Sequence, residues 1–567
     1  MRFSVGIDLG TTNTVVSIAR KGITGNIEVN TENISQLSED SYSLDNDPLL
    51  PSVLYVNNDH EHIVGKFAKA MKGQNTSRVI FNSKNFIGEN DYEWVIDDKK
   101  YTPELVAGHF LRAIRNYLVD KYVNSTEDID SAVITVPASF NVDQRDATKR
   151  AAKLAGFSGD ITLISEPTAA ILDFINEQSK FDDSARDLDF SDFKNVLVFD
   201  LGGGTCDVAI LKIKINEKNI QAEEIGVSPH TLIGGTNFDA YATAGVLKDF
   251  SKENNIDFKK ELSEETLKKL KNLLFIQLEK IKLQFSSKYL FGKNKNVNID
   301  DLVKSIEYTI TIPNIINGKP FKYKLNMEKY NKYISPLLDK ENDENIINPI
   351  DETLNNCDMK KEDIDYVFCV GGMTNYSKVW ESIRDYFGKE PCKFSDSMQS
   401  VSRGAAIYHH YEVGLTKKDN EKSKGENKNL GTTIDIIPRL PQSVFLNVKN
   451  GFPVRLIESQ TKAGTPILHE NLIKVSSEIG LVLELYTGKS NFDPNMKKLN
   501  NVKLEFPYGV KVGSDIVLSL EYTTKGVLNF EAWLKDDPTI KIEIKLEDGN
   551  LNNCDDYDQI KDVKGVV

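Results

Sequence analysis

The sequence predicts an internally duplicated α/β domain followed by an all-β domain. Residues 3–18 and 196–207 each combine an apolar β-branched run, a terminal aspartate, a glycine turn and hydroxyl side chains. Apolar runs of this length indicate buried strands, and the glycines allow a tight turn whose N–H groups can approach an anion. Beyond residue 433, short alternating runs separated by Gly, Pro and Asn replace the helical periodicity. That pattern indicates an antiparallel β-sandwich or barrel.

The two glycine turns, about 190 residues apart, predict a nucleotide site between them. One turn follows Asp8, and the other follows Asp200 and returns through Thr205 and Asp207. A carboxylate, a glycine turn, a hydroxyl and a second carboxylate suit a phosphate with its Mg²⁺. One such turn alone is weak evidence, because a β-hairpin with surface acids explains it as well. Their repetition is what favours a nucleotide.

The composition excludes several classes of protein. The net charge of −14 over 567 residues argues against nonspecific nucleic-acid binding. The five cysteines lie far apart without a Cys-x-x-Cys pair, which argues against a disulfide framework or a zinc site. A strand pattern begins at residue 3, and no apolar run reaches membrane-spanning length. We therefore expect no signal peptide, no membrane segment and a cytoplasmic location.

Other candidate site residues keep two interpretations at this stage. Lys84 lies in a mostly apolar run, where it is either a snorkelling surface residue or a ligand of the γ-phosphate or attacking water. Glu166 ends a strand and is either a catalytic or metal-shell acid or a helix-start carboxylate. Gly234 and Gly235 form a turn before a helix that can meet phosphate. A polar stripe on a predicted helix over 263–286 suits adenosine, although a solvated face gives the same pattern: Glu279, Lys282 and Ser286.

The chain divides into four segments by composition. We expect a nucleotide-binding domain over residues 1–415 and a flexible charged linker over 416–433, which holds one aliphatic residue, Leu430. The all-β domain is expected over 434–546, and the acidic segment 547–567 is expected to be a frayed tail.

The ordered motifs resemble the heat-shock protein 70 chaperone family, and Asn13 after the paired threonines is similar to its DnaK-like bacterial branch. The resemblance covers nearly the whole chain and is carried by Gly6–Asn13, Val136–Asn141 with Gln144 and Arg145, Glu166–Ala170, Phe199–Thr205, Gly371–Gly372 and Gly526–Ala532.

This resemblance implies a duplicated, ribonuclease H-like, actin-like ATPase domain followed by a β-sandwich that holds extended apolar peptides. It implies ATP or ADP with Mg²⁺, and K⁺ as a further cation. Its implied metal-shell residues are Asp8 and Asp200, and its implied catalytic residues are Lys84, Glu166, Thr205, Asp200 and Asp207. Its implied nucleotide contacts are Gly10, Thr11, Thr12, Asn13, Gly202, Gly203, Gly234, Gly235, Glu279, Lys282, Ser286, Gly371, Gly372 and Asn375.

The resemblance further implies a monomeric, ATP-hydrolysing chaperone for unfolded polypeptides, with a J-domain co-chaperone and a nucleotide exchange factor as partners. We expect the peptide pocket near Leu481 and Leu483. An Arg that the family uses for J-domain docking is replaced by Thr162. The linker offers chiefly Leu430 and Ile434 where the family has several leucines, so we expect weaker docking of the linker. Only about twenty residues follow the β domain here, so we expect the family's helical lid to be absent.

Two alternatives share the same actin-like fold, and a fold alone does not settle function. A sugar kinase would use the same phosphate hairpins, but it needs neither the linker nor an all-β domain. An ATP-binding, filament-forming protein fits the appended β domain poorly.

Overall fold

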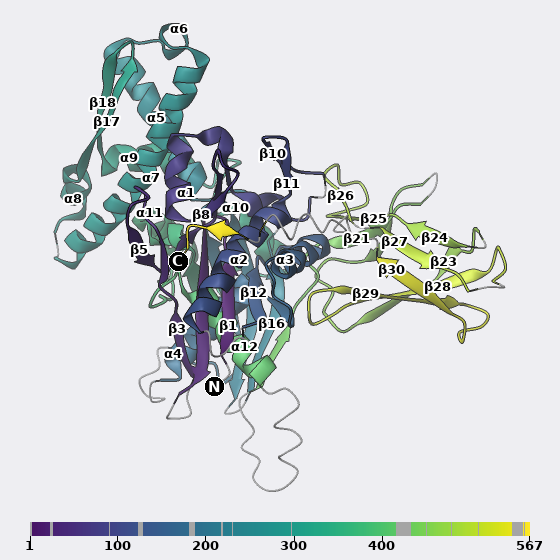
Figure 1. Cartoon of the computed structure of the whole chain (residues 1–567). Helices are drawn as coiled ribbons and strands as arrows, with labels where there is room; N and C mark the ends of the chain where they lie inside the picture. Colours follow the sequence, from purple (N-terminus) through teal and green to yellow (C-terminus); the bar gives the residue numbers. More distant parts are fainter. Residues whose placement is uncertain are drawn as a thin grey trace.

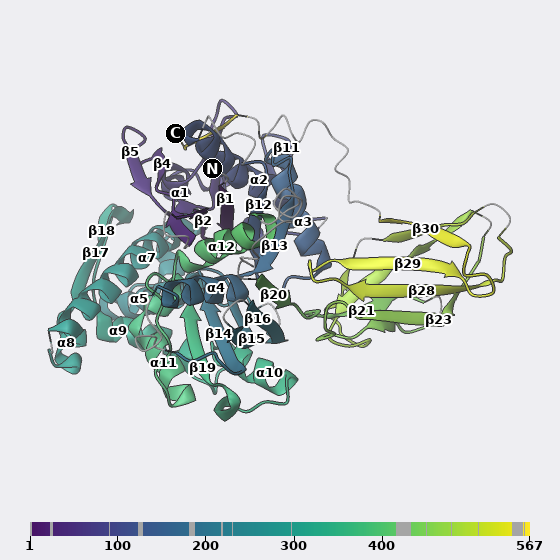
Figure 2. The same ribbon diagram turned by 90° about the horizontal axis from the view of Figure 1, so that it is seen from below.

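The computed structural model describes residues 3–22, 27–89, 91–122, 129–180, 188–216, 219–228, 231–295, 297–414, 433–448, 451–477, 479–499, 501–507, 510–546, 560 and 562–566. An α/β body with two outer lobes forms most of the molecule, and a β-rich domain projects from its side (Figures 1 and 2).

The first half of the body is built on a mixed sheet in the order β13-β12-β1-β2-β3. Strand β1 is antiparallel to β2 and parallel to β12, so Asp8 lies opposite Val15 on one side and Thr135 on the other. The central strand is buried, as its apolar run predicts. The elements are β1 (Ser4–Leu9), β2 (Asn13–Lys21), β3 (Ile27–Thr31), β6 (Leu50–Pro51), β12 (Ala132–Val136), β13 (Ile161–Ser165), α2 (Pro103–Lys121) and α3 (Val142–Leu154).

The second half repeats this topology in the order β19-β14-β15-β16-β20. Strand β14 is antiparallel to β15 and parallel to β19, as β1 is to β2 and β12. Helices α4 and α12 lie between the two sheets (Figure 2). The elements are β14 (Lys194–Leu201), β15 (Cys206–Asn216), β16 (Asn219–Val227), β19 (Tyr366–Val370), β20 (Thr433–Ile437), α4 (Glu166–Gln178), α10 (Asn348–Asn356), α11 (Ser377–Phe387) and α12 (Ser400–Gly414).

Two outer lobes rise from this body. The first lobe holds a sheet in the order β31-β8-β7-β9, a β4-β5 hairpin and a β10-β11 hairpin. Its elements are β4 (Ile34–Leu37), β5 (Leu44–Asp47), β7 (Val53–Val56), β8 (His62–Val64), α1 (Lys66–Ala70), η1 (Met71–Gly73), η2 (Thr76–Arg78), β9 (Val79–Phe81), η3 (Ser83–Phe86), β10 (Trp94–Ile96), β11 (Lys99–Tyr101) and β31 (Val563–Lys564).

The second lobe is mostly helical and is drawn in teal in Figure 1. Its long helix α7 buries one apolar face that includes Leu274, Leu278 and Phe285. The periodicity of those residues predicts this face. The elements are α5 (Gly235–Asn254), α6 (Phe258–Glu261), α7 (Glu264–Asn294), α8 (Ile299–Ser305), β17 (Glu307–Ile316), β18 (Lys319–Asn326), α9 (Met327–Ile334) and η6 (Ser335–Leu338). Two further short turns, η7 (Lys361–Asp363) and η8 (Gly372–Asn375), flank β19 of the body.

The β-rich domain contains two antiparallel sheets, in the orders β22-β21-β25-β26 and β23-β28-β29-β30-β27-β24. One apolar cluster from both sheets forms its core. The strands are β21 (Ser443–Leu446), β22 (Val454–Ile457), β23 (Pro466–Lys474), β24 (Gly480–Leu483), β25 (Leu485–Gly488), β26 (Lys497–Lys498), β27 (Val502–Glu505), β28 (Asp515–Tyr522), β29 (Leu528–Leu534) and β30 (Lys541–Leu546).

Two segments differ from the sequence-based expectation. Strand β20 does not belong to the β domain, because it pairs in parallel with β16 at the edge of the second body sheet, and Ile434 is only 5% exposed there. Ile434 and the half-buried Ile436 pack against the body core, so this segment docks without the leucine run. Residues 563–564 are not frayed, since they form β31 in the first lobe. Residues 416–432 and 547–559, the rest of the expected linker and most of the expected tail, lie outside the described residues.

Within the described part of the chain, no helix combines the length and the apolar character needed to cross a membrane.

Candidate functional site

The two glycine turns meet between the halves of the body. A Cβ atom added at Gly203 would lie 1.7 Å from Oγ1 of Thr12, so only glycine permits this approach. Gly234 backs onto the second turn in a similar way, because its added Cβ would lie 2.5 Å from the backbone nitrogen of Gly204. The first and second hairpins and the start of α5 therefore converge on one place.

A buried ion pair spans the site. Nζ of Lys84 donates to Oε1 of Glu166 at 2.5 Å, and both side chains are buried. Lys84 comes from the short helix η3 of the first lobe, whereas Glu166 is the first residue of α4. Burial raises the pKa of Glu166 to about 7, and the Lys84 ammonium opposes that rise. The burial of Lys84 does not agree with a snorkelling surface residue, whereas Glu166 is both the first residue of its helix and a member of the ion pair.

Three aspartates surround this pair. Oδ1 of Asp8 accepts a hydrogen bond from Oγ1 of Thr135 at 3.1 Å, and Oδ1 of Asp207 accepts one from Oγ of Ser139 at 2.7 Å. Asp200 lies opposite Asp207 in the β14–β15 register. Burial raises the pKa of Asp8 and raises that of Asp200 well above its usual range, the latter with a further contribution from the neighbouring carboxylates.

Four carboxyl groups around one ammonium group give this site an excess of acidic groups. Buried charges of one sign are costly unless a counter-charge approaches them. Among the described residues, no three acidic, His or Cys side chains converge closely enough to bind a metal ion directly. The donor set fits a hydrated divalent cation with Asp8 and Asp200 in its outer shell, as Mg²⁺ often keeps several waters.

A cavity of about 100 Å³ lies at the junction of the turns. Most of the predicted phosphate, metal and catalytic residues line it, namely Asp8, Gly10, Thr11, Thr12, Asn13, Lys84, Glu166, Asp200, Gly202, Gly203, Thr205, Gly371 and Gly372. Asp207 is buried beside this wall, next to Asp200 in the register of its hairpin.

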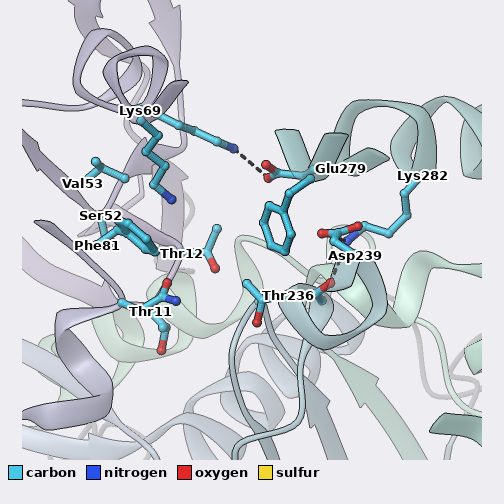
Figure 3. Close-up of a pocket in the computed structure, with 15 residues that line it drawn as sticks. Thr11, Thr12, Ser52, Val53, Lys69, Phe81, Thr236, Asp239, Glu279 and Lys282 are labelled. Carbon is cyan, nitrogen blue, oxygen red and sulfur yellow. Dashed lines mark hydrogen bonds and ion pairs between the residues drawn. The ribbon is translucent and has the colours of Figure 1, made fainter. Parts of the chain in front are cut away.

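A second cavity, of about 60 Å³, shares Thr11, Thr12 and Gly203 with the first and extends between the lobes (Figure 3). Gly235, Glu279 and Lys282, three of the predicted nucleotide contacts, line it. Lys282 is nevertheless engaged within the protein. Its Nζ donates to Oδ2 of Asp239 at 2.7 Å and to the Gly235 carbonyl at 3.2 Å, so it holds the start of α5 against α7.

The lobes are joined across this cleft by an ion pair that the sequence did not reveal. Nζ of Lys69, from α1, lies 2.7 Å from Oε1 of Glu279 on α7 (Figure 3). Nearby, Nζ of Lys72 lies 4.0 Å from the centre of the Phe81 ring, and burial lowers the pKa of Lys72 to about 8. Lys69 and Lys72 belong to an ordinary mixed run of residues, so only their three-dimensional neighbours identify them.

Two predicted adenosine contacts lie apart from these cavities. Ser286 is one helical turn beyond Lys282 on α7 and lines neither of them. Asn375 donates through Nδ2 to Oγ of Ser397 at 3.1 Å and lines a third cavity, of about 370 Å³, together with Tyr289 and Met398. Met398 also lines the first cavity, so the third adjoins it.

The predicted peptide-pocket residues lie on β24. Leu481 and Leu483 are two positions apart, so both side chains point to the same face of the strand. Leu483 is only 3% exposed inside the core of the β domain, whereas Leu481 is partly exposed at the border of that core. Leu481 is therefore the better placed of the two to meet a ligand.

A family model described as "Hsp70 protein" matches residues 4–96 and 90–421, which is well over half of the chain and contains every residue of this cleft. The chain belongs to the Hsp70 family. It is 30% identical over 463 residues to the chaperone protein DnaK of Thermotoga petrophila, covering 81% of this chain and 66% of that protein. It is 31% identical over 450 residues to the Thermosipho melanesiensis DnaK, covering 79% and 64% of the two chains.

A longer alignment extends into the β domain. The DnaK of Burkholderia cenocepacia is 27% identical over 587 residues, covering 99% of this chain and 80% of that protein. The chain spans just under two thirds of the length of the Thermotoga and Thermosipho relatives. Membership of the Hsp70 family does not favour the sugar-kinase and filament alternatives.

Proposed function

We propose that this Hsp70-family chain is an ATP-dependent molecular chaperone that hydrolyses ATP to ADP and phosphate and binds extended apolar segments of unfolded polypeptides. One observation carries the hydrolytic part. The buried Lys84–Glu166 pair and the aspartates Asp8 and Asp200 face a cavity that both glycine turns line. Such a site suits phosphoryl transfer, in which positioning and charge neutralisation dominate.

Mg²⁺ bound with ATP would neutralise charge on its phosphates. Asp8 and Asp200 would hold its water shell, since both carboxylates are half-buried and line the cavity. The excess of carboxyl over ammonium groups fits this cation. K⁺ is a further proposal by family analogy.

The remaining groups divide between binding and positioning. Backbone N–H groups of the turns at residues 10–13 and 202–205 and at the start of α5 would cradle the phosphates. Lys84 and Glu166 would orient the attacking water, with the Thr205 hydroxyl beside them. With a pKa of about 7, Glu166 can hold or release a proton near neutral pH.

For the peptide, we propose the region of β24. This strand lies at the edge of its sheet, where it can pair with an added extended segment. Ile479, just before β24, is 82% exposed, and Val482 and Leu481 offer further apolar surface. Exposed apolar side chains beside a strand edge suit an extended apolar peptide.

The proposal also includes the partners that the family resemblance implies. These are a J-domain co-chaperone and a nucleotide exchange factor, with a monomeric chain in the cytoplasm. Thr162 lies on β13 of the first body sheet, where its partial exposure leaves room for a contact.

The test measures ATP cleavage and peptide binding separately on the full chain. Phosphate release should require Mg²⁺, and a fluorescent apolar peptide should bind the chain but not the variant Leu481→Asp. The matched surface control is Leu468→Asp on β23, because Leu468 is 54% exposed and lies on the strand at the other edge of the sheet. Absence of Mg²⁺-dependent hydrolysis, or equal peptide binding by both variants, would contradict the corresponding half of the proposal.

A further inference from the structure

Residues near the C-terminus pair with two strands of the first lobe. Strand β31 pairs in parallel with β8, with Val563 opposite His62 and Lys564 opposite Ile63. On its other side, the Leu37 amide donates to the Gly565 carbonyl at 2.9 Å, and Val566 forms an antiparallel bridge with Gln36. Figure 1 shows this yellow strand beside β8. The segment thus joins β4 and β8, which otherwise belong to separate sheets.

Side chains anchor the same segment. Ile560 is completely buried in the core of the first half of the body. Its Cδ1 atom lies beside Gly108 of α2, within ordinary van der Waals distance (3.5 Å) of the position that a Cβ atom would take there. Val563 and Val566 pack against the same core, and Lys564 forms an ion pair with Glu61. Backbone pairing on two sides, an apolar anchor and a charge pair are the components of strand-addition recognition.

The site is connected to the nucleotide cleft through short stretches of chain. Strand β8 ends at Val64, and Gly65 leads directly into α1, which carries Lys69 of the cross-cleft ion pair. The docked segment itself is connected to the β domain: the 13 residues 547–559 separate it from β30, the last strand of that domain. A second chain connection, distinct from β20, therefore links the β domain to the lobe that holds Lys69.

We propose that the facing edges of β4 and β8 form a peptide-binding site whose occupant is the chain's own docked segment, Ile560 with residues 562–566. The bound segment completes the sheet of the first lobe and fastens the end of the β-domain chain to it. This binding site involves neither the nucleotide cavity nor the edge of β24.

Hydrogen exchange on the full chain without nucleotide tests the docking. In the unaltered chain, the Leu37 amide and amides of residues 62–64 should be protected. Ile560→Asp should accelerate their exchange by about tenfold or more, because undocking opens this part of the lobe locally, while β14 and β15 stay unchanged. The neighbouring exposed Asp562→Asn is the matched control and should change nothing. Equal exchange in the unaltered chain and in Ile560→Asp would overturn the proposal.

A second experiment identifies the occupant. A labelled synthetic peptide of residues 557–567 should bind full-length Ile560→Asp, and the same peptide with Ile560→Asp should not. Adding Glu61→Lys to the protein should weaken binding, and a Lys564→Glu peptide should restore it. Adding Leu481→Asp should have no effect. Binding that is lost with Leu481→Asp but insensitive to Glu61→Lys would place the peptide on the β domain and overturn the proposal, whether or not the chain hydrolyses ATP. If the full chain sediments as a dimer in which each copy's C-terminal segment occupies the site of the other copy, docking within one chain would be overturned.

Discussion

Nζ of Lys84 lies 2.5 Å from Oε1 of Glu166, although 82 positions separate the two residues in the chain. The pair joins the first lobe to the α/β body at the point where the two glycine turns meet. The burial of the pair changes the acidity of Glu166. Removal from water raises the pKa of its carboxyl group, and the Lys84 ammonium group opposes that rise.

Lys84→Ala should lower the rate of ATP hydrolysis by about 10²-fold, because a positioned cation facing the reacting groups typically contributes that much. Nucleotide affinity should change less, since the glycine turns remain. Single-turnover hydrolysis and calorimetric ADP binding measure the two effects. Lys268→Ala, on the exposed face of α7, is the matched control and should keep the original rate. Equal rates of ATP hydrolysis in both variants would show that Lys84 takes no part in the reaction.

Lys69→Ala should speed ADP release about two- to five-fold. A partly exposed ion pair contributes about 0.5–1 kcal/mol, and the loss of that free energy corresponds to this change in rate. The Lys69–Glu279 pair is the contact drawn across the cleft in Figure 3, and both side chains are partly exposed. Stopped-flow release of a fluorescent ADP measures the effect, and the difference should shrink at high salt. An unchanged release rate at low salt would show that the pair does not restrain opening.

The first lobe should lose stability in acid because of His62. Its Nε2 atom lies 3.0 Å from the Tyr101 hydroxyl oxygen, and burial lowers the pKa of His62 to about 4. Between pH 6.5 and pH 4, the unfolded chain therefore binds more protons than the native chain. The contribution of neutral His62 to the free energy of unfolding is fully present above pH 6.5 and is lost as the pH falls. The loss between pH 7 and pH 5 amounts to about 2 kcal/mol.

Urea unfolding at pH 7 and pH 5 measures this contribution in the original chain and in His62→Phe. The variant should show a pH-dependent loss smaller by about that amount, because phenylalanine does not titrate. Identical pH dependence in the two proteins would mean that His62 is not the responsible group.

Ile434→Asp should release the β domain from the body. Ile434 is a buried residue of the edge strand β20, and nearby Arg439 forms an ion pair with Glu223 of β16 at 2.8 Å. A buried aspartate there is costly, so β20 should detach. The radius of gyration in solution scattering and the exchange of β16 amides should both rise, whereas the exposed Asp435→Asn should change neither. A compact Ile434→Asp chain with protected β16 would show that other contacts hold the domains.

The hairpins and their acids were predictable from sequence because each is a local pattern. The strand before Asp8 or Asp200, the glycines and the following hydroxyls lie within about a dozen residues. The duplicated order of the two sheets follows from the repetition of that pattern. By contrast, the ionic contact of Lys69 with Glu279 depends on two lobes far apart in sequence, and no local feature marks it.

Docking of segments was also beyond sequence reasoning. Residues 433–437 alternate in a way that suits either a β domain or a sheet edge, and the choice depends on the apolar surface beside β16. Ile560 lies in a segment rich in Asp and Asn, and the core that buries it is built by distant parts of the chain, including helix α2. Composition correctly indicates that such segments are polar, but it does not indicate which strands they pair with.

ATP hydrolysis by the full chain, measured with and without an apolar peptide, tests most directly whether one molecule combines the Lys84–Glu166 site with a peptide-binding β domain, joined by the docked strand β20. We expect Mg²⁺-dependent phosphate release that rises several-fold with an apolar peptide. A polar peptide of equal length should have no effect, and Leu481→Asp should abolish the stimulation without changing the basal rate. No hydrolysis, or a rate of phosphate release that does not change although the peptide is bound, would contradict this combination of ATPase site and peptide-binding domain.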